Sequence, residues 1–372
     1  MDSLLFSPLR LGSLQVPNRI VSLPLYLAYP GEDHAVDDLV LDYYDEMAAS
    51  GVGLVIVENV TVEPCGLGNP RTLLISEDRF IPGLARLAQT IQRHGIPAVL
   101  QIHHAGRYAN RPDRIAPSPV ETWGVVPQAM DQACIDRVVG AFAAGARRAR
   151  EAGFDGVELH GGTGYLLPQF LSPRTNLRED AYGGDASRRM RFPLEVLAAV
   201  RAEVGAAFTV GYRFLADEYM PGGLTLTDTL PFAQALAGAG VSYLSVMAGC
   251  YDAFQQPRYL EDDAKEAFMA PFAQAVKRAL PGIPVVAAGR IQRPETAAAI
   301  LRDGMADLVG LARVLFADPL WPRKARGEIH DPINPCTPGC LLCLKRVKEQ
   351  RPAYCGRWSK ARRERFLERV GG

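Results

Sequence analysis

The sequence lacks an excess of charge of either sign. Its 372 residues include 41 Lys and Arg against 41 Asp and Glu, so the formal net charge is zero at pH 7. A chain without net charge has no overall field that favours nucleic acid or an anionic membrane as a partner. We therefore expect neither of these partners, and we expect a small-molecule substrate instead.

Long apolar runs are also missing. There is no stretch of about 20 apolar residues, and the first residues, MDSLLFSPLR, do not place an apolar run behind a basic segment. We therefore expect no membrane span and no secretory signal peptide, which indicates the reducing cytoplasm. The chain is nevertheless 48% hydrophobic, which is enough for a large core.

Cysteine is sparse along most of the chain and concentrated near its end. Cys65, Cys134 and Cys250 are far apart, whereas four others follow a C-x3-C-x2-C-x11-C pattern. These four are Cys336, Cys340, Cys343 and Cys355. Such spacing is typical of one compact metal centre and favours a 4Fe-4S cluster with one thiolate on each iron. Zinc, which more often takes two separated C-x2-C pairs, and a disulfide stay open as alternatives.

Eight short apolar runs recur, and each is followed by a helix-like segment. Runs such as VIVE and PVVAA are apolar without alternation, which is typical of parallel strands covered on both faces. Eight strand–helix units predict a (β/α)8 barrel, of the TIM type. A doubly wound sheet is the alternative, but no G-x-G-x-x-G follows the first run. The predicted strands are Ile20–Pro24, Leu54–Glu58, Ala98–Ile102, Gly156–Leu159, Phe208–Arg213, Tyr243–Met247, Pro284–Ala288 and Leu308–Leu311.

Several segments complete this prediction. Amphipathic stretches predict helices over Ala141–Ala152, Arg188–Val204 and Pro294–Arg302. The segment LFSPLRLGSLQVPNRI predicts an N-terminal hairpin that closes the floor of the barrel. Asp-Pro-Ile-Asn-Pro predicts a boundary between a barrel of residues 1–330 and a cysteine-bearing tail of residues 331–372. The basic residues of the tail indicate a solvated helix face or a docking patch for an acidic electron-transfer protein.

Polar residues follow several of the predicted strands, at the end of the barrel where such enzymes carry their chemistry. Gln101 and His160 belong to two of these strand ends, and Arg213 to a third. After the last two strands come Gly289-Arg290 and Ala312-Arg313. A glycine turn that exposes N–H groups, combined with an arginine, predicts a phosphate site for a cofactor or a substrate.

These strand ends bring the chain close to a known family. Over residues 1–330 it resembles the Old Yellow Enzyme family of flavin oxidoreductases, in stretches such as QIHHAGR, GLVIVENVTVEP, VLFADP and AGFDGVELHGGTGYLLPQFLSPRTNLREDAYGG. The resemblance implies an FMN-dependent enzyme, with FMN over the barrel mouth. It also implies reduction of an activated C=C bond in an enone, enoate or enoyl thioester.

The resemblance also implies which residues hold FMN. Two positions depart from the family pattern, because Tyr26 stands where Thr or Cys is usual and Ala312 where Gly is usual. The residues implied for the isoalloxazine are Pro24, Leu25, Tyr26, Asn59, Gln101 and Arg213, and those for the phosphate are Gly289, Arg290, Ala312 and Arg313.

Three residues near the fourth strand carry the implied catalysis. Tyr165 matches the family's proton donor, and His160 matches the residue that hydrogen-bonds the substrate carbonyl. Thr163 stands where the family usually has His or Asn as the second carbonyl donor. Either Tyr251 or Asp252, after the sixth strand, is a candidate for a further acid–base or substrate-binding group, with simple loop filling as the alternative.

The cysteine tail resembles the subgroup that contains 2,4-dienoyl-CoA reductase and trimethylamine dehydrogenase. These enzymes hold a 4Fe-4S cluster beside the flavin, although the first cysteine gap here is one residue longer. The sequence lacks their dinucleotide-binding domains, so we expect electrons from NAD(P)H directly, or through the cluster from a separate electron-transfer protein or flavoprotein subunit. We also expect a homo-oligomer. The alternative functions are an oxidative demethylase or amine dehydrogenase, and an idle electron-transfer subunit.

Overall fold

Eight parallel strands close into a barrel in the computed structural model, which describes residues 4–337 and 339–371. Their order around the barrel follows their order in the chain, so the (β/α)8 prediction is confirmed and the doubly wound sheet is excluded. Each predicted strand overlaps one of them. The strands are β3 (Ile20–Ser22), β4 (Leu54–Thr61), β5 (Ala98–His103), β8 (Gly156–Gly161), β9 (Thr209–Leu215), β10 (Tyr243–Met247), β11 (Val285–Ala287) and β12 (Leu308–Leu311).

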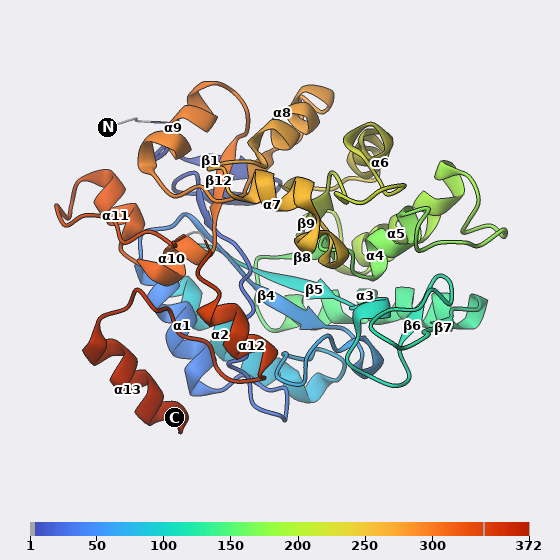
Figure 1. Ribbon diagram of the computed structural model, residues 1–372, viewed down its shortest axis with the longest axis horizontal. Helices are drawn as coiled ribbons and strands as arrows, with labels where there is room; N and C mark the ends of the chain where they lie inside the picture. Colours follow the sequence, from blue (N-terminus) through green and yellow to red (C-terminus); the bar gives the residue numbers. More distant parts are fainter. Residues whose placement is uncertain (1–3, 338, 372) are drawn as a thin grey trace.

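Helices surround the barrel (Figure 1), and their buried residues share one hydrophobic core with the strands. In α3, the inward residues Ile135, Val138 and Phe142 recur at helical spacing and are fully buried, and Asp131 caps the helix by accepting a hydrogen bond from the Cys134 amide. The three predicted helices overlap α3, α5 and α9. The surrounding helices are α1 (Asp38–Ala49), α2 (Ile81–Gln92), α3 (Gln132–Glu151), α5 (Ala186–Val204), α6 (Leu226–Gly238), α8 (Ala270–Ala279), α9 (Pro294–Arg302), α10 (Arg313–Ala317) and α11 (Trp321–Arg326).

The predicted N-terminal hairpin is present and covers the amino-terminal end of the barrel. It consists of the antiparallel strands β1 (Leu9–Leu11) and β2 (Leu14–Val16). Ser13 Oγ lies 3.0 Å from the hydroxyl of Thr209, the first residue of β9. The buried leucines of the hairpin join one hydrophobic cluster with residues of several barrel strands. The carboxyl end of the barrel is therefore the end left for a site.

Short additional elements gather in the connections at the carboxyl end of the barrel. The chain after β8 continues into α4, and the connection after β10 contains α7. These elements are η1 (Pro64–Gly66), η2 (Asp78–Phe80), η3 (Gly106–Tyr108), β6 (Ile115–Ala116), β7 (Gln128–Ala129), α4 (Leu166–Leu171), η4 (Tyr251–Gln255) and α7 (Pro257–Asp263).

The cysteine-bearing tail packs against the barrel through two helices, α12 (Leu342–Lys348) and α13 (Lys360–Val370). Helix α13 lies beside α1, where Arg362 and Arg369 form ion pairs with Glu46 and Asp42 (Figure 1). The backbone N–H of Ala353 donates to the carbonyl of Leu27, in the segment that follows β3. The tail is thereby tied to the mouth of the barrel. Within the described chain, no helix combines the length and the apolarity needed to cross a membrane.

Candidate functional site

Two polar pairs line the interior of the barrel near its mouth. Gln101 Nε2 donates to Glu158 Oε1 at 2.7 Å, and Arg213 Nη1 donates to Ser245 Oγ at 2.6 Å. Burial raises the pKa of Glu158 and lowers that of Arg213, and the two charges oppose these shifts in each other. Four polar side chains from four neighbouring strands are thus held in fixed positions beneath the mouth.

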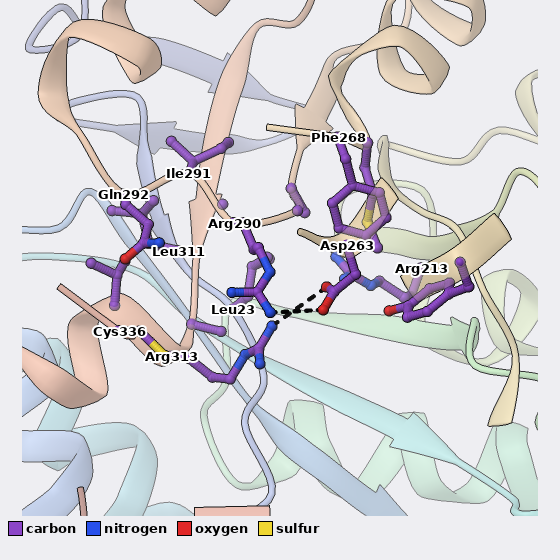
Figure 2. Close-up of a pocket in the computed structure, with 17 residues that line it drawn as sticks. Leu23, Arg213, Asp263, Phe268, Arg290, Ile291, Gln292, Leu311, Arg313 and Cys336 are labelled. Atoms are coloured by element: carbon purple, nitrogen blue, oxygen red, sulfur yellow. Dashed lines mark hydrogen bonds and ion pairs between the residues drawn. The ribbon is translucent and has the colours of Figure 1, made fainter. Parts of the chain in front are cut away.

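A pocket after β11 and β12 has the form of an anion cradle (Figure 2). Gly289 has a φ of +92°, and a Cβ atom there would lie 2.7 Å from Met269 Cγ, so only glycine fits this turn. The Arg290 side chain is 9% exposed, and its buried Nε has no hydrogen-bond partner among the described residues. Arg313 lines the same pocket and is more exposed. Two guanidinium groups and a bare donor are the features that bind a phosphate.

An aspartate of α7 reaches into this cradle. Asp263 Oδ2 lies 2.7 Å from Arg290 Nη2, and Asp263 Oδ1 lies 3.9 Å from Arg313 Nη2. Figure 2 shows the carboxylate facing both guanidinium groups across the pocket. A carboxylate therefore contacts the cations that a phosphate would need.

Tyr165 and His160 meet on the opposite side of the mouth. Their rings lie edge to face with centroids 4.8 Å apart, and the Tyr165 hydroxyl is 2.7 Å from that of Tyr251. Burial, followed by the neighbouring Tyr251, raises the pKa of Tyr165 far above its ordinary value, so the phenol keeps its proton at neutral pH. The Gly162 N–H donates to His160 Nδ1 at 3.2 Å, which places the imidazole proton on Nε2. Burial lowers the pKa of His160 well below its ordinary value, so this ring is a neutral donor.

Thr163 and Tyr26, like Ala312, depart from the family pattern. Thr163 has a φ of +59°, and its hydroxyl donates to Met247 Sδ at 3.6 Å. Tyr26 is partly buried with Pro24 and Leu25 after β3, and its hydroxyl has no partner in the described structure. Neither hydroxyl forms a hydrogen bond with His160 or Tyr165.

Asn59 contacts a histidine to which the sequence analysis assigned no role. Its Nδ2 lies 3.1 Å from Nε2 of His103, the last residue of β5. The His103 ring lies edge to face against Tyr165 at a centroid distance of 4.7 Å and is 5.9 Å from the His160 ring. His103 therefore belongs to the same corner as the two predicted catalytic residues.

The four tail cysteines line one small cavity together with Arg313. Cys336 also lines the anion cradle, so the two cavities share Cys336 and Arg313 as a common wall. Burial raises the pKa of Cys336, Cys343 and Cys355, and the neighbouring thiolates of the set act in the same direction. A bound cation would relieve this repulsion.

A second set of metal-ligating side chains lies away from the tail, where ligand atoms of Glu63, Cys65 and His104 are within 4.8 Å of one another. His104 Nδ1 accepts from the Gly106 N–H at 3.0 Å, so its Nε2 carries the proton and donates to Glu63 at 3.1 Å. The Cys65 thiol also donates to the Glu63 carboxylate, and Arg137 forms an ion pair with the same carboxylate. This set is a satisfied hydrogen-bond network, with no free lone pair on the imidazole for a cation.

The barrel mouth thus combines a closed (β/α)8 barrel, an anion cradle and buried neutral hydrogen-bond donors. Residues 4–331 match the NADH:flavin oxidoreductase / NADH oxidase family, and the chain belongs to this family. The predicted membership in a family of flavin oxidoreductases is therefore confirmed.

Individual relatives agree with the family. The chain is 40% identical to a metal reductase of Desulforamulus reducens over 98% of its own length and 55% of that protein. It is 37% identical to an NADPH dehydrogenase of Geobacillus sp. strain WCH70, over 90% of this chain and 97% of the relative. A solved 2-naphthoyl-CoA reductase in complex with 2-naphthoyl-CoA superimposes with a TM-score of 0.91 at 25% identity, over 96% of this chain and 57% of that one. The chain thus spans about half the length of its long relatives.

The structure brings twelve of the seventeen predicted site residues together in three groups. Sequence reasoning missed Asp263 and His103: Asp263 comes from a long connection without a motif, whereas His103 lay visible in QIHHAGR. The cradle pocket is lined by Arg213, Gly289, Arg290, Ala312 and Arg313; the opposite corner holds Asn59, His160 and Tyr165; the tail cavity holds the four cysteines.

Proposed function

We propose that this enzyme reduces an electron-poor C=C bond conjugated to a carbonyl group, with FMN at the barrel mouth and a 4Fe-4S cluster in the tail that relays electrons to it. The observation that carries the proposal is the protonated phenol of Tyr165 beside the neutral N–H donor of His160. When bound, FMN supplies the hydride for one alkene carbon.

The cradle residues fit the phosphate of FMN. Arg290 and Arg313 supply the positive charge. The Nε–H of Arg290, which has no partner among the described residues, could donate a hydrogen bond to a phosphate oxygen. Arg213 stands at the barrel side of the same pocket, where a cation would stabilise a reduced, anionic isoalloxazine. Gln101, Asn59 and the segment Pro24–Tyr26 complete the proposed ring site on the neighbouring strand ends.

Tyr165 and His160 would divide the remaining chemistry. His160 Nε2–H would donate to the carbonyl oxygen and stabilise the negative charge that develops there. The Tyr165 hydroxyl would give its proton to the alkene carbon next to the carbonyl, and the Tyr251 hydroxyl at 2.7 Å would stabilise the phenolate that is left.

The spacing of the tail cysteines supports a cluster more than a single zinc ion. Tetrahedral zinc with bonds of about 2.3 Å needs sulfur atoms about 3.8 Å apart. Among the described residues only Glu63, Cys65 and His104 bring three ligand atoms within 4.8 Å, so no three tail sulfurs are that close. A cubic cluster, which places an iron at each thiolate, needs the wider spacing.

The two proposed cofactor sites lie in successive parts of the chain. We infer an FMN-binding barrel in residues 1–330 and a cluster-binding tail in residues 331–372, of which residues 1–3, 338 and 372 lie outside the described structure. The long metal reductase matches 98% of this chain, tail included, whereas the short NADPH dehydrogenase matches 90%. The shared wall of Cys336 and Arg313 supports a route from cluster to flavin, fed by a separate electron-transfer protein. NAD(P)H is the alternative donor.

Anaerobic half-reactions test this function. We expect the photoreduced, FMN-loaded enzyme to regain its oxidised flavin spectrum on addition of cyclohexenone. We expect the oxidised enzyme to keep its spectrum on addition of trimethylamine. Reduction of the flavin by the amine, without oxidation by the enone, would replace the reductase with an amine dehydrogenase. Inertness toward both would favour an idle electron-transfer subunit.

One observation favours amine oxidation as the second candidate. The rings of Tyr108, Trp123 and Tyr251 gather at the mouth, with centroids 4.9 to 5.9 Å apart, and Trp123 is 64% exposed. Aromatic faces attract alkylammonium ions. The same rings also fit a flat, uncharged substrate, and the half-reactions above decide between the two.

Asp263 should lower the affinity of Arg290 and Arg313 for the FMN phosphate. Its carboxylate pairs with Arg290 and faces Arg313, so a bound phosphate must displace it or lie beside a like charge. We expect Asp263→Asn to release FMN about tenfold more slowly, which corresponds to about 1.4 kcal/mol. The measurement is the recovery of free-flavin fluorescence after dilution of the holoenzyme.

Glu261→Gln is the matched control, since Glu261 lies on the same helix, is highly exposed and pairs with Lys265. It should leave the release rate as in the unmodified protein. Faster release from Asp263→Asn would contradict the prediction and would assign Asp263 to orienting Arg290 toward the phosphate.

A further inference from the structure

We propose that His103 is the second hydrogen-bond donor to the substrate's carbonyl oxygen, opposite His160. This inference rests on the proposed reduction of an activated alkene and deepens it. It implies that the substrate presents an oxygen atom that accepts hydrogen bonds from two imidazole N–H groups. It also gives a role to a residue that the family resemblance did not single out.

The position of His103 places it beside the reacting groups. Ile102 of β5 and Leu159 of β8 are register partners in adjacent parallel strands, and His103 and His160 each follow by one residue. The two imidazole centroids are 5.9 Å apart, and Tyr165 packs edge to face against both rings. The three rings therefore form one corner of the barrel mouth.

The hydrogen bonds of His103 assign its tautomer. Its Nε2 lies 3.1 Å from Asn59 Nδ2 and 3.1 Å from Thr61 Oγ1. An amide nitrogen is a donor, so Nε2 accepts and the ring proton lies on Nδ1. Complete burial, reinforced by the adjacent His104, lowers the pKa of His103 to about 3, so the ring is neutral.

The resulting Nδ1–H donor has no partner. His103 is fully buried, and its Nδ1 is without a hydrogen-bond acceptor in the described residues. A buried donor that is left unpaired costs free energy, and proteins seldom retain one without a ligand that satisfies it. A carbonyl oxygen placed between His103 and His160 would satisfy it, and Tyr165, which packs against both rings, would then lie close to the carbon next to that carbonyl.

Thr163 explains why a second donor would come from another strand. Its hydroxyl is directed to Met247 Sδ, and its backbone has a left-handed φ of +59°. The position three residues after His160 thus offers no donor in this arrangement. β5 supplies one instead, and the substrate class becomes an enone, enoate or enoyl thioester with an accessible carbonyl oxygen.

The test uses p-nitrophenol, whose phenolate resembles an enolate oxygen and whose absorbance reports its ionisation. We expect the FMN holoenzyme to bind it with the pKa of the phenol lowered. His103→Phe, which keeps a flat ring without the donor, should weaken binding about tenfold, as expected for one lost hydrogen bond. His103→Asn keeps an N–H donor near the same place and should restore most of the affinity and of the shifted pKa.

The outcomes separate this inference from the proposed function. If His160→Phe weakens binding and His103→Phe does not, the carbonyl site stands and the role of His103 is overturned. If the unmodified holoenzyme does not bind p-nitrophenol, the carbonyl site itself fails. Should His103→Phe lose flavin or fold poorly, the comparison of His103→Asn with His103→Ala decides whether His103 is a donor. The affinity for p-nitrophenol must then be higher in the variant that keeps an N–H donor.

Discussion

Replacement of Tyr165 by phenylalanine will slow the oxidation of the photoreduced enzyme by cyclohexenone by about 10²- to 10⁴-fold, the range for loss of a positioned general acid. The variant keeps the aromatic ring that packs against His103 and His160, so the corner stays filled. It loses only the proton that would go to carbon and the hydrogen bond to Tyr251. The measurement is flavin absorbance in an anaerobic stopped-flow experiment.

Tyr212→Phe is a suitable control for this variant. Tyr212 is buried on β9, packs against Phe232 of α6, and its hydroxyl has no partner within the described structure. The same chemical change there should leave the oxidation rate nearly unchanged. An equal rate for Tyr165→Phe and the unmodified enzyme would remove Tyr165 from the proton-donor role. Loss of flavin binding would indicate a structural role.

Replacement of Cys343 by serine will remove the metal centre of the tail. Anaerobically purified enzyme should contain about four irons per chain, whereas the variant should contain almost none, because each iron of the cluster needs its thiolate. FMN should stay bound, since its proposed cradle is built by the ends of β11 and β12. The measurements are iron, sulfide and zinc analysis together with the absorbance spectrum.

Cys134→Ser provides the matched control for the tail variant. Cys134 is a half-buried cysteine on α3 whose sulfur accepts from Arg137, and it does not line the tail cavity. Its loss should leave the iron content unchanged. Zinc in place of iron in the unmodified protein would overturn the cluster, and iron that survives Cys343→Ser would remove Cys343 from the ligand set.

The barrel was predictable because its signals are local. Continuous apolar runs, helical periodicity and turn residues each act over a few neighbours, and they located all eight barrel strands. The proximity of Gly289 and Arg290 to Ala312 and Arg313 was predictable for the same reason. Parallel strands end at one edge, so residues that follow β11 and β12 must be neighbours. The glycine at 289 follows from its turn, where a side chain would collide with Met269.

What the sequence did not predict depends on contacts between distant segments. Asp263 approaches Arg290 because the connection after β10 folds back over the cradle. The spacing of residues in the sequence does not predict how such a long connection folds. His103 was visible in its motif, but its unpaired Nδ1 follows from Asn59 and Thr61 occupying the other nitrogen. The wall that Cys336 shares with Arg313 likewise needs the tail to dock as it does.

The hydrogen bond from the Ala353 N–H to the Leu27 carbonyl attaches the tail to the segment that follows β3 at the barrel mouth. The Tyr29 hydroxyl donates a second hydrogen bond between barrel and tail, to the Ala353 carbonyl at 2.9 Å. The indole N–H of Trp358 donates to the carbonyl of Phe316 in α10 at 2.7 Å. Such docking uses no thiolate, so we expect it to persist in a cell short of iron. If the proposed cluster supplies the electrons, scarcity of iron would then stop the activity without unfolding the polypeptide, and activity would return on repair of the cluster without new synthesis.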